Sequence, residues 1–121
     1  MWLMTTFGFF SVVRDTQHPG HLLVRSRSHN DLTELARRFD ARGLDEPQIL
    51  EMPLADYRYR IIAPAPAVAE VLGNEIQDIN YPNFKNEVAR AHSPKRAQLY
   101  SQIWMVIREH FLRRPTKPIA P

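Results

Sequence analysis

The stretch HLLVRSRSHNDLTELARRF, residues 21–39, has the pattern of a strand that runs directly into a helix. Side chains alternate between two faces along a strand, so Arg25 and Arg27 lie on the same face. An N-cap at Asn30 or Asp31, followed by apolar residues at helical spacing, predicts a helix from there to residue 41. The first structural unit is therefore a strand with two guanidiniums on one face, followed by a helix.

The sequence before and after this stretch completes a repeated order of elements. Residues 5–13 are apolar on both faces, which predicts a central strand, and the turn residues after them predict a hairpin. Further strands are expected at 48–52 and 57–63, and a helix at 66–79. This ββαββα order predicts an α+β fold: an antiparallel sheet of about four strands, a circularly permuted relative of the ferredoxin-like arrangement, with both helices on one face.

Two additional helices are expected in the C-terminal part of the chain. A short helix begins near Asn83, and a longer one begins after the cap Ser93. The longer helix carries large apolar side chains at helical spacing, so we expect that face to be buried, and it could cover part of the sheet's second face. Residues 1–112 are predicted to form a single domain, followed by a proline-rich, disordered tail over residues 113–121.

Composition and charge limit the class of protein. The 121-residue chain has no cysteine, which excludes disulfides and thiolate chemistry and fits a cytoplasmic location. Its apolar beginning lacks the flanks of a signal peptide, and no apolar run approaches the ~20 residues that span a bilayer, so no membrane partner is expected. Residues 1–80 hold eight basic and eleven acidic side chains, whereas residues 81–121 hold eight and two. This asymmetry suggests an anionic partner, although a solvated basic helix and tail explain it as well.

The main candidates for a binding site are the strand arginines Arg25, Arg27, Arg58 and Arg60. If both strands turn their arginines away from the helices, four guanidiniums lie on one sheet face. In one interpretation they pair with acids such as Glu51 or Asp56, or pack their stems under the C-terminal helix. In the other they form an anion platform flanked by Tyr57, Tyr59 or the N-terminal phenylalanines, the mixture of rings and cations that binds single-stranded nucleic acid.

The turn YPNFK, residues 81–85, is a second candidate site. Tyr81, Asn83 and Lys85 stand where a helix begins, and the free backbone donors there can receive an anion beside Lys85. The other interpretation makes Asn83 an ordinary N-cap and Phe84 a core anchor.

No metal or cofactor is predicted. His18, His21 and His29 have no acid or cysteine at a spacing that would complete a metal site.

Several motifs taken together carry a resemblance. The segments MWLMTTFGFFSVV, LLVRSRS, ADYRYRI and YPNFKNEV, followed by YSQIW, resemble a family of small bacterial cytoplasmic proteins with a Trp-containing GFFS strand, an Arg-x-Arg strand and an NFK turn. The resemblance covers about residues 1–107. It implies a bacterial, cytoplasmic protein, and it implies no activity, cofactor or site residue.

Three hypotheses of function follow. The leading one is a non-enzymatic module that binds nucleic acid or an acidic protein through the strand arginines, Lys85 and the basic C-terminal segment. A second is a small enzyme or ligand pocket in which Lys85 and a strand arginine hold a phosphate or carboxylate, with Tyr81 or Asp56 for proton transfer. A third is a homodimer or other protein contact made by the C-terminal helix, with Tyr100, Trp104 and Phe111 at the interface.

Overall fold

The computed structural model describes residues 1–113, which fall into two compact units, Met1–Pro82 and a second unit that begins at Asn83. The predicted tail, residues 113–121, lies outside the described residues apart from Arg113. A single domain over residues 1–112 stays a prediction, and the two units are described in turn.

The first unit contains an antiparallel sheet with strand order β1-β2-β3-β5-β4 and two helices, which makes the fold α+β as predicted. The strands are β1 Trp2–Thr5, β2 Gly8–Arg14, β3 His21–Ser26, β4 Leu50–Glu51 and β5 Tyr59–Pro64. The helices are α1 His29–Ala41 and α2 Ala65–Gln77.

The sheet has five strands where about four were expected, because the residues before the predicted first strand form a strand of their own, β1, which a tight turn joins to β2. β1 and β2 are joined at Thr5, whose hydroxyl accepts hydrogen bonds from the Phe7 and Gly8 amides at 3.2 and 3.0 Å and donates to the Gly8 carbonyl at 2.8 Å. This Thr-centred turn is stabilised by a side chain, a device that an apolar pattern does not reveal.

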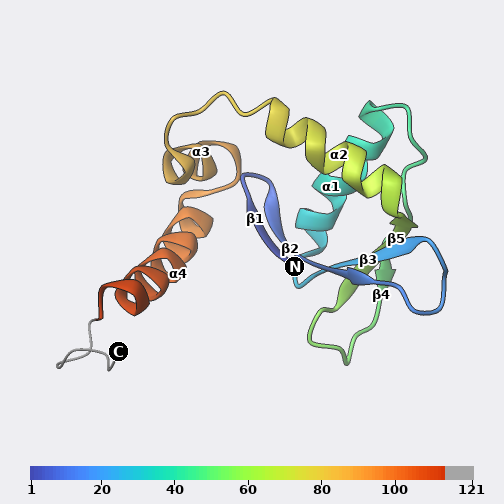
Figure 1. Ribbon diagram of the computed structural model, residues 1–121, viewed down its shortest axis with the longest axis horizontal. Helices are drawn as coiled ribbons and strands as arrows, with labels where there is room; N and C mark the ends of the chain where they lie inside the picture. Colours follow the sequence, from blue (N-terminus) through green and yellow to red (C-terminus); the bar gives the residue numbers. More distant parts are fainter. Residues whose placement is uncertain (114–121) are drawn as a thin grey trace, which may run out of the picture. The chain divides into compact units, whose positions relative to one another are not determined.

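The core lies on one face of the sheet, under both helices (Figure 1). Alternation along the strands brings five residues to that face: Phe10, Val12, Val24, Ile61 and Ala63. The helices cover them with residues at helical spacing: Leu32, Leu35, Ala36 and Phe39 from α1, and Val68 and Val71 from α2. The opposite face therefore carries the residues in between, among them Arg25 and Arg60.

The start of α1 is tied to β2 by side-chain hydrogen bonds. Ser28 is the N-cap, accepting from the Asp31 amide at 3.2 Å, so the helix begins two residues before the predicted Asp31 start. The carboxylate of Asp31, which is 1% exposed, accepts from the Phe9 amide at 3.0 Å. A residue expected to cap its own helix thus receives a hydrogen bond from a strand.

The second unit is a pair of helices, α3 Phe84–Ala91 and α4 Pro94–Leu112. Asn83 and Ser93 cap them, each accepting a backbone amide hydrogen bond from three residues ahead. The Phe84 and Tyr100 rings stack with centroids 5.7 Å apart. Tyr100 is buried, but α4 runs on past α3 (Figure 1), and its later apolar side chains are exposed. The expectation that the whole apolar face is buried is therefore wrong: Tyr100 is buried, whereas Leu99, Trp104, Ile107 and Phe111 are exposed.

Candidate anion-binding site on the sheet

One cross-strand row on the sheet face opposite α1 and α2 contains two arginines side by side. The row has one residue from each strand, and each residue is the register partner of the next. From β1 to β4 across the sheet, these residues are Trp2, Ser11, Arg25, Arg60 and Leu50. Arg25 and Arg60 are direct partners at the middle of this row. Like charges directly opposite each other weaken a strand pair, so this arrangement costs stability.

Arg25 and Arg60 make few hydrogen bonds. Arg25 donates from Nη2 to the Ser11 hydroxyl at 2.9 Å, and Arg60 donates from Nη2 to the Tyr57 carbonyl at 3.2 Å. The Nε atoms of both arginines are buried and have no hydrogen-bond partner. Within residues 1–113, no carboxylate forms an ion pair with either side chain. Two partly buried positive charges thus share a site that lacks a negative one.

Arg27 and Arg58, by contrast, are neutralised. Arg27 donates from Nε and Nη2 to the two oxygens of Asp56 at 3.0 and 2.9 Å, a bidentate pair. Arg58 donates from Nε to Glu51 at 2.7 Å. These hydrogen bonds raise the pKa of Arg27 and of Arg58 above the usual arginine value. The interpretation in which the strand arginines pair with Asp56 or Glu51 therefore holds for two of the four, Arg27 and Arg58.

A tyrosine ring lies against the arginines. The guanidinium carbons of Arg25 and Arg27 are 4.7 and 4.4 Å from the centroid of the Tyr57 ring, within cation–π range. Tyr59 points the other way, because it pairs with Ser26 in the register and its ring meets His29 edge-on at 5.2 Å on the helix side. Of the two predicted flanking tyrosines, Tyr57 lies against Arg25 and Arg27, whereas the centroid of the Tyr59 ring is 5.7 Å from the guanidinium carbon of Arg58.

Sequence reasoning missed Ser11 and Trp2 as members of this site. Ser11 is 1% exposed and supplies a hydroxyl to Arg25, while Trp2 is 75% exposed at the end of the same row. Their positions depend on the β1–β2 hairpin and on strand register. A polar Ser11 inside an apolar strand was the one available signal.

The YPNFK turn is organised as a helix start. Asn83 accepts from the Asn86 amide at 2.9 Å as the N-cap, and Phe84 stacks on Tyr100. The Lys85 ammonium lies 5.0 Å from the centroid of the Trp104 ring on α4. Tyr81 is partly buried at the end of the first unit. Lys85 and the strand arginines belong to different units, and their combination in one site stays a prediction.

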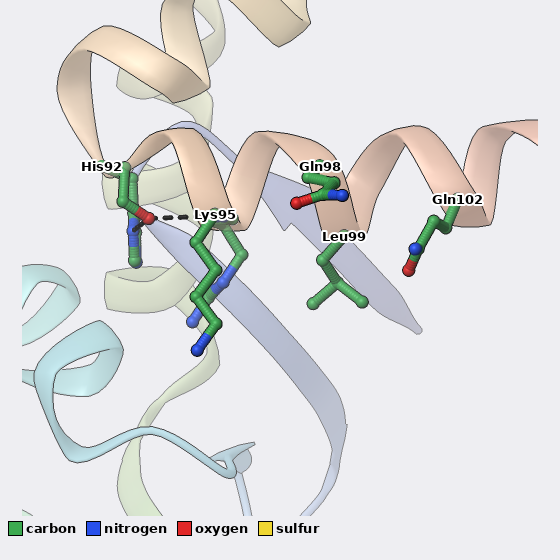
Figure 2. A pocket seen from close by; sticks show the side chains of 7 residues that line it. His92, Lys95, Gln98, Leu99 and Gln102 are labelled. Atoms are coloured by element: carbon green, nitrogen blue, oxygen red, sulfur yellow. Dashed lines mark hydrogen bonds between the residues drawn. The ribbon is translucent and has the colours of Figure 1, made fainter.

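A shallow cavity of about 620 Å³ lies along the start of α4. Its lining residues all come from one stretch of chain: His92, Ser93, Lys95, Arg96, Gln98, Leu99 and Gln102. Figure 2 shows Lys95, Leu99 and Gln102 projecting from successive turns of the helix. None of the residues proposed from the sequence lines this cavity.

The described part of the chain contains no group of three or more His, Cys, Asp or Glu side chains placed to hold a metal ion. None of its helices is both long and apolar enough to cross a bilayer. Comparison with protein-family models, with curated proteins and with solved structures finds no match to this chain.

Proposed function

We propose that this protein is a non-enzymatic binding module for an anionic partner, and that Arg25 and Arg60 form the centre of its contact surface. The observation that supports this proposal is their direct cross-strand pairing, with no ion pair between either arginine and a carboxylate among the described residues. Guanidinium groups bind phosphate and carboxylate in bidentate geometry. An anion bound by both guanidinium groups cancels the repulsion between the strands.

The surroundings of the arginine pair favour the phosphate groups of single-stranded nucleic acid over the carboxylates of an acidic protein. The Tyr57 ring lies against Arg25, and the exposed Trp2 ring stands at the end of the row. Bases stack on such rings while their phosphates bind the arginines, and each stacked base contributes about 1–3 kcal/mol. An acidic peptide would bind the two arginines but would have no bases to stack on the Tyr57 and Trp2 rings.

Charge-matched variants test the site. Fluorescence polarisation with labelled single-stranded RNA, single-stranded DNA and a poly-glutamate peptide would compare wild type with Arg25→Gln/Arg60→Gln. The control Arg37→Gln/Arg42→Gln removes two charges from exposed ion pairs of the same unit. We expect the site variant to bind RNA or DNA at least about tenfold more weakly than wild type. The control should bind within about twofold of wild type if the site, and not net charge, is responsible.

Salt dependence gives an independent readout of the same contacts. The logarithm of the single-strand association constant falls with the logarithm of salt concentration by about 0.7 per phosphate contact, so losing two contacts reduces the slope by about 1.4. Equal loss in both double variants, or no binding at low salt, would overturn the proposal. If the protein binds poly-glutamate and neither nucleic acid, the partner of the site is an acidic protein.

Arg27 and Arg58 should matter less than the leading sequence hypothesis held. Because Asp56 and Glu51 already neutralise them, we expect Arg27→Gln and Arg58→Gln each to weaken binding by less than about threefold in the same assay. An effect as large as that of Arg25→Gln would show that the ligand displaces Asp56 or Glu51.

Three further statements belong with this proposal. The order β2-β3-β5-β4, with α1 and α2 on one face, supports a permuted ferredoxin-like arrangement with β1 added at the edge. The proposed cytoplasmic location rests on the absence of cysteine and on the sequence motifs, and the proposed membership of the bacterial family rests on those motifs alone. In the enzyme hypothesis, the proposed proton carrier Asp56 accepts two hydrogen bonds from Arg27.

A further inference from the structure

The loop between β4 and β5 contacts three arginines with two adjacent residues. The Asp56 carboxylate accepts two hydrogen bonds from Arg27, at 3.0 and 2.9 Å. The Tyr57 ring lies against the guanidinium groups of Arg25 and Arg27, and the Tyr57 carbonyl accepts a hydrogen bond from Arg60. Two loop residues therefore hold three guanidinium groups, and a negative charge holds one of them.

Arg27 lies close to the pair formed by Arg25 and Arg60. The guanidinium carbons of Arg25 and Arg27 are 4.7 and 4.4 Å from the centroid of one ring, that of Tyr57. The two carbons are therefore at most about 9 Å apart, which is both distances laid end to end. Salt screens charges over about 10 Å at 0.1 M, so both guanidinium groups act on the same bound anion.

The ion pair between Arg27 and Asp56 is exposed, and the loop does not depend on it alone. The two side chains are 57% and 70% exposed, and exposed ion pairs contribute about 0–1 kcal/mol to stability. Two backbone hydrogen bonds also hold the loop: the Met52 amide donates to the Arg58 carbonyl at 2.7 Å, and the Ala55 amide donates to the Met52 carbonyl at 3.0 Å. The charge of Asp56 can therefore be removed without releasing the loop.

The carboxylate occupies the donors with which Arg27 would bind a phosphate. Carboxylate and phosphate both accept two parallel hydrogen bonds from a guanidinium group, and Asp56 already accepts those of Nε and Nη2. A phosphate bound by Arg25 and Arg60 therefore has a neutral ion pair beside it instead of a third positive charge.

We propose that Asp56 masks Arg27 as a third phosphate contact of the arginine site and thereby limits how tightly the site binds single-stranded nucleic acid. This inference rests on the proposed function, because it concerns the regulation of the surface that Arg25 and Arg60 form. Arg27 contributes little to binding while Asp56 holds it, and it contributes fully once the charge of Asp56 is removed.

Single substitutions compared by fluorescence polarisation with labelled single-stranded RNA test the masking. We expect Asp56→Asn to bind about fivefold more tightly than wild type, because one guanidinium group gains a phosphate partner. Its salt slope should be steeper by about 0.7, as for one added contact. The matched control Asp78→Asn removes the same charge from the exposed pair with Arg42 and should bind within about twofold of wild type. Both variants should keep the wild-type circular dichroism spectrum.

A double-mutant cycle separates masking from a general effect of charge. In the Asp56→Asn background, Arg27→Gln should abolish the whole fivefold gain, whereas in wild type it should weaken binding by less than about threefold. Unchanged affinity in Asp56→Asn, equal tightening in Asp78→Asn, or a gain that persists without Arg27 would overturn the masking and leave the anion site standing.

Failure of the anion site itself has a different signature. If Arg25→Gln/Arg60→Gln binds RNA as wild type does, or if wild type does not bind RNA at low salt, the proposed function is overturned and the masking with it.

Discussion

Gly8, the first residue of β2, has no room for a methyl group. A Cβ there would lie 2.6 Å from Cβ of Asp31 and 2.7 Å from the tip of the Phe10 ring. Asp31 is held by its hydrogen bond from the Phe9 amide, and Phe10 is fully buried, so neither gives way easily. We expect Gly8→Ala to lower the free energy of unfolding by about 1–3 kcal/mol, measured by urea denaturation.

Gly73 provides the matched control for this substitution. It lies inside α2, and nothing stands within 4 Å of the position that a Cβ would take. Alanine there should raise stability by about 0.5–1 kcal/mol, because it restricts the unfolded chain and favours the helix. A loss at Gly73 equal to that at Gly8 would show that crowding is not the cause.

Asp15, in the loop between β2 and β3, should make stability depend on pH. Its carboxylate accepts from the Gln17 amide at 2.9 Å and contacts His18 Nδ1 at 2.7 Å, and these bonds, the first above all, lower the pKa of Asp15 below its ordinary 3.8. The unfolded chain therefore binds its proton at higher pH than the folded one, and this contribution to stability is lost as the pH falls through the folded-state pKa.

Comparing Asp15→Asn with wild type isolates this contribution. The variant should be less stable near neutral pH, and the difference in free energy of unfolding should shrink as the pH falls from about 5 to about 2. Urea denaturation at each pH measures it. A difference that stays constant over this range would assign the effect to packing instead of charge.

At the scale of single elements, the N-cap of α1 is a separable contribution. Ser28→Ala removes the oxygen that accepts from the Asp31 amide, and we expect a loss of about 0.5–2 kcal/mol in the free energy of unfolding, whereas Ser28→Asn retains most of the stability. Thermal unfolding of both variants provides the measurement. Equal losses would mean that packing at this position matters more than the cap.

The sequence predicted elements well where one face was apolar and the other polar. The patterns for β3, β5, α1 and α2 placed each within a few residues of its observed bounds. β1 escaped notice because residues 2–13 are apolar on both sides, so period-two alternation does not mark a turn among them. The strand predicted at residues 48–52 is shorter in the structure, where β4 has only the two residues Leu50 and Glu51.

The site was predictable only in part. Alternation alone predicted that Arg25 and Arg60 lie on the sheet face away from the helices only if both strands turn their arginines that way. Their direct opposition depends on the register between β3 and β5, which loop lengths and packing set together. Which arginines are neutralised also depends on three-dimensional neighbours, since Asp56 is 29 residues from Arg27 along the chain.

At the scale of the whole molecule, the first unit should fold without the second. Every residue of the hydrophobic core cluster lies before Pro82. We expect a chain ending at Pro82 to give a dispersed amide NMR spectrum and a cooperative thermal transition, and to keep the proposed anion-binding activity. A truncated chain without a cooperative transition would show that the helices after Asn83 are required for folding.

The opposed arginines have a consequence for motion. Arg25 and Arg60 form the second-to-last pair of the β3–β5 ladder, next to the terminal pair Ser26 and Tyr59. Repulsion near the end of a ladder favours fraying there, so the backbone amides around Ser26 and Tyr59 should exchange with deuterium faster than those near Leu22 in the empty protein. An anion bound by both guanidiniums should hold the strand ends together. Slower exchange of the backbone amides near Ser26 and Tyr59 would then show that the anion has bound.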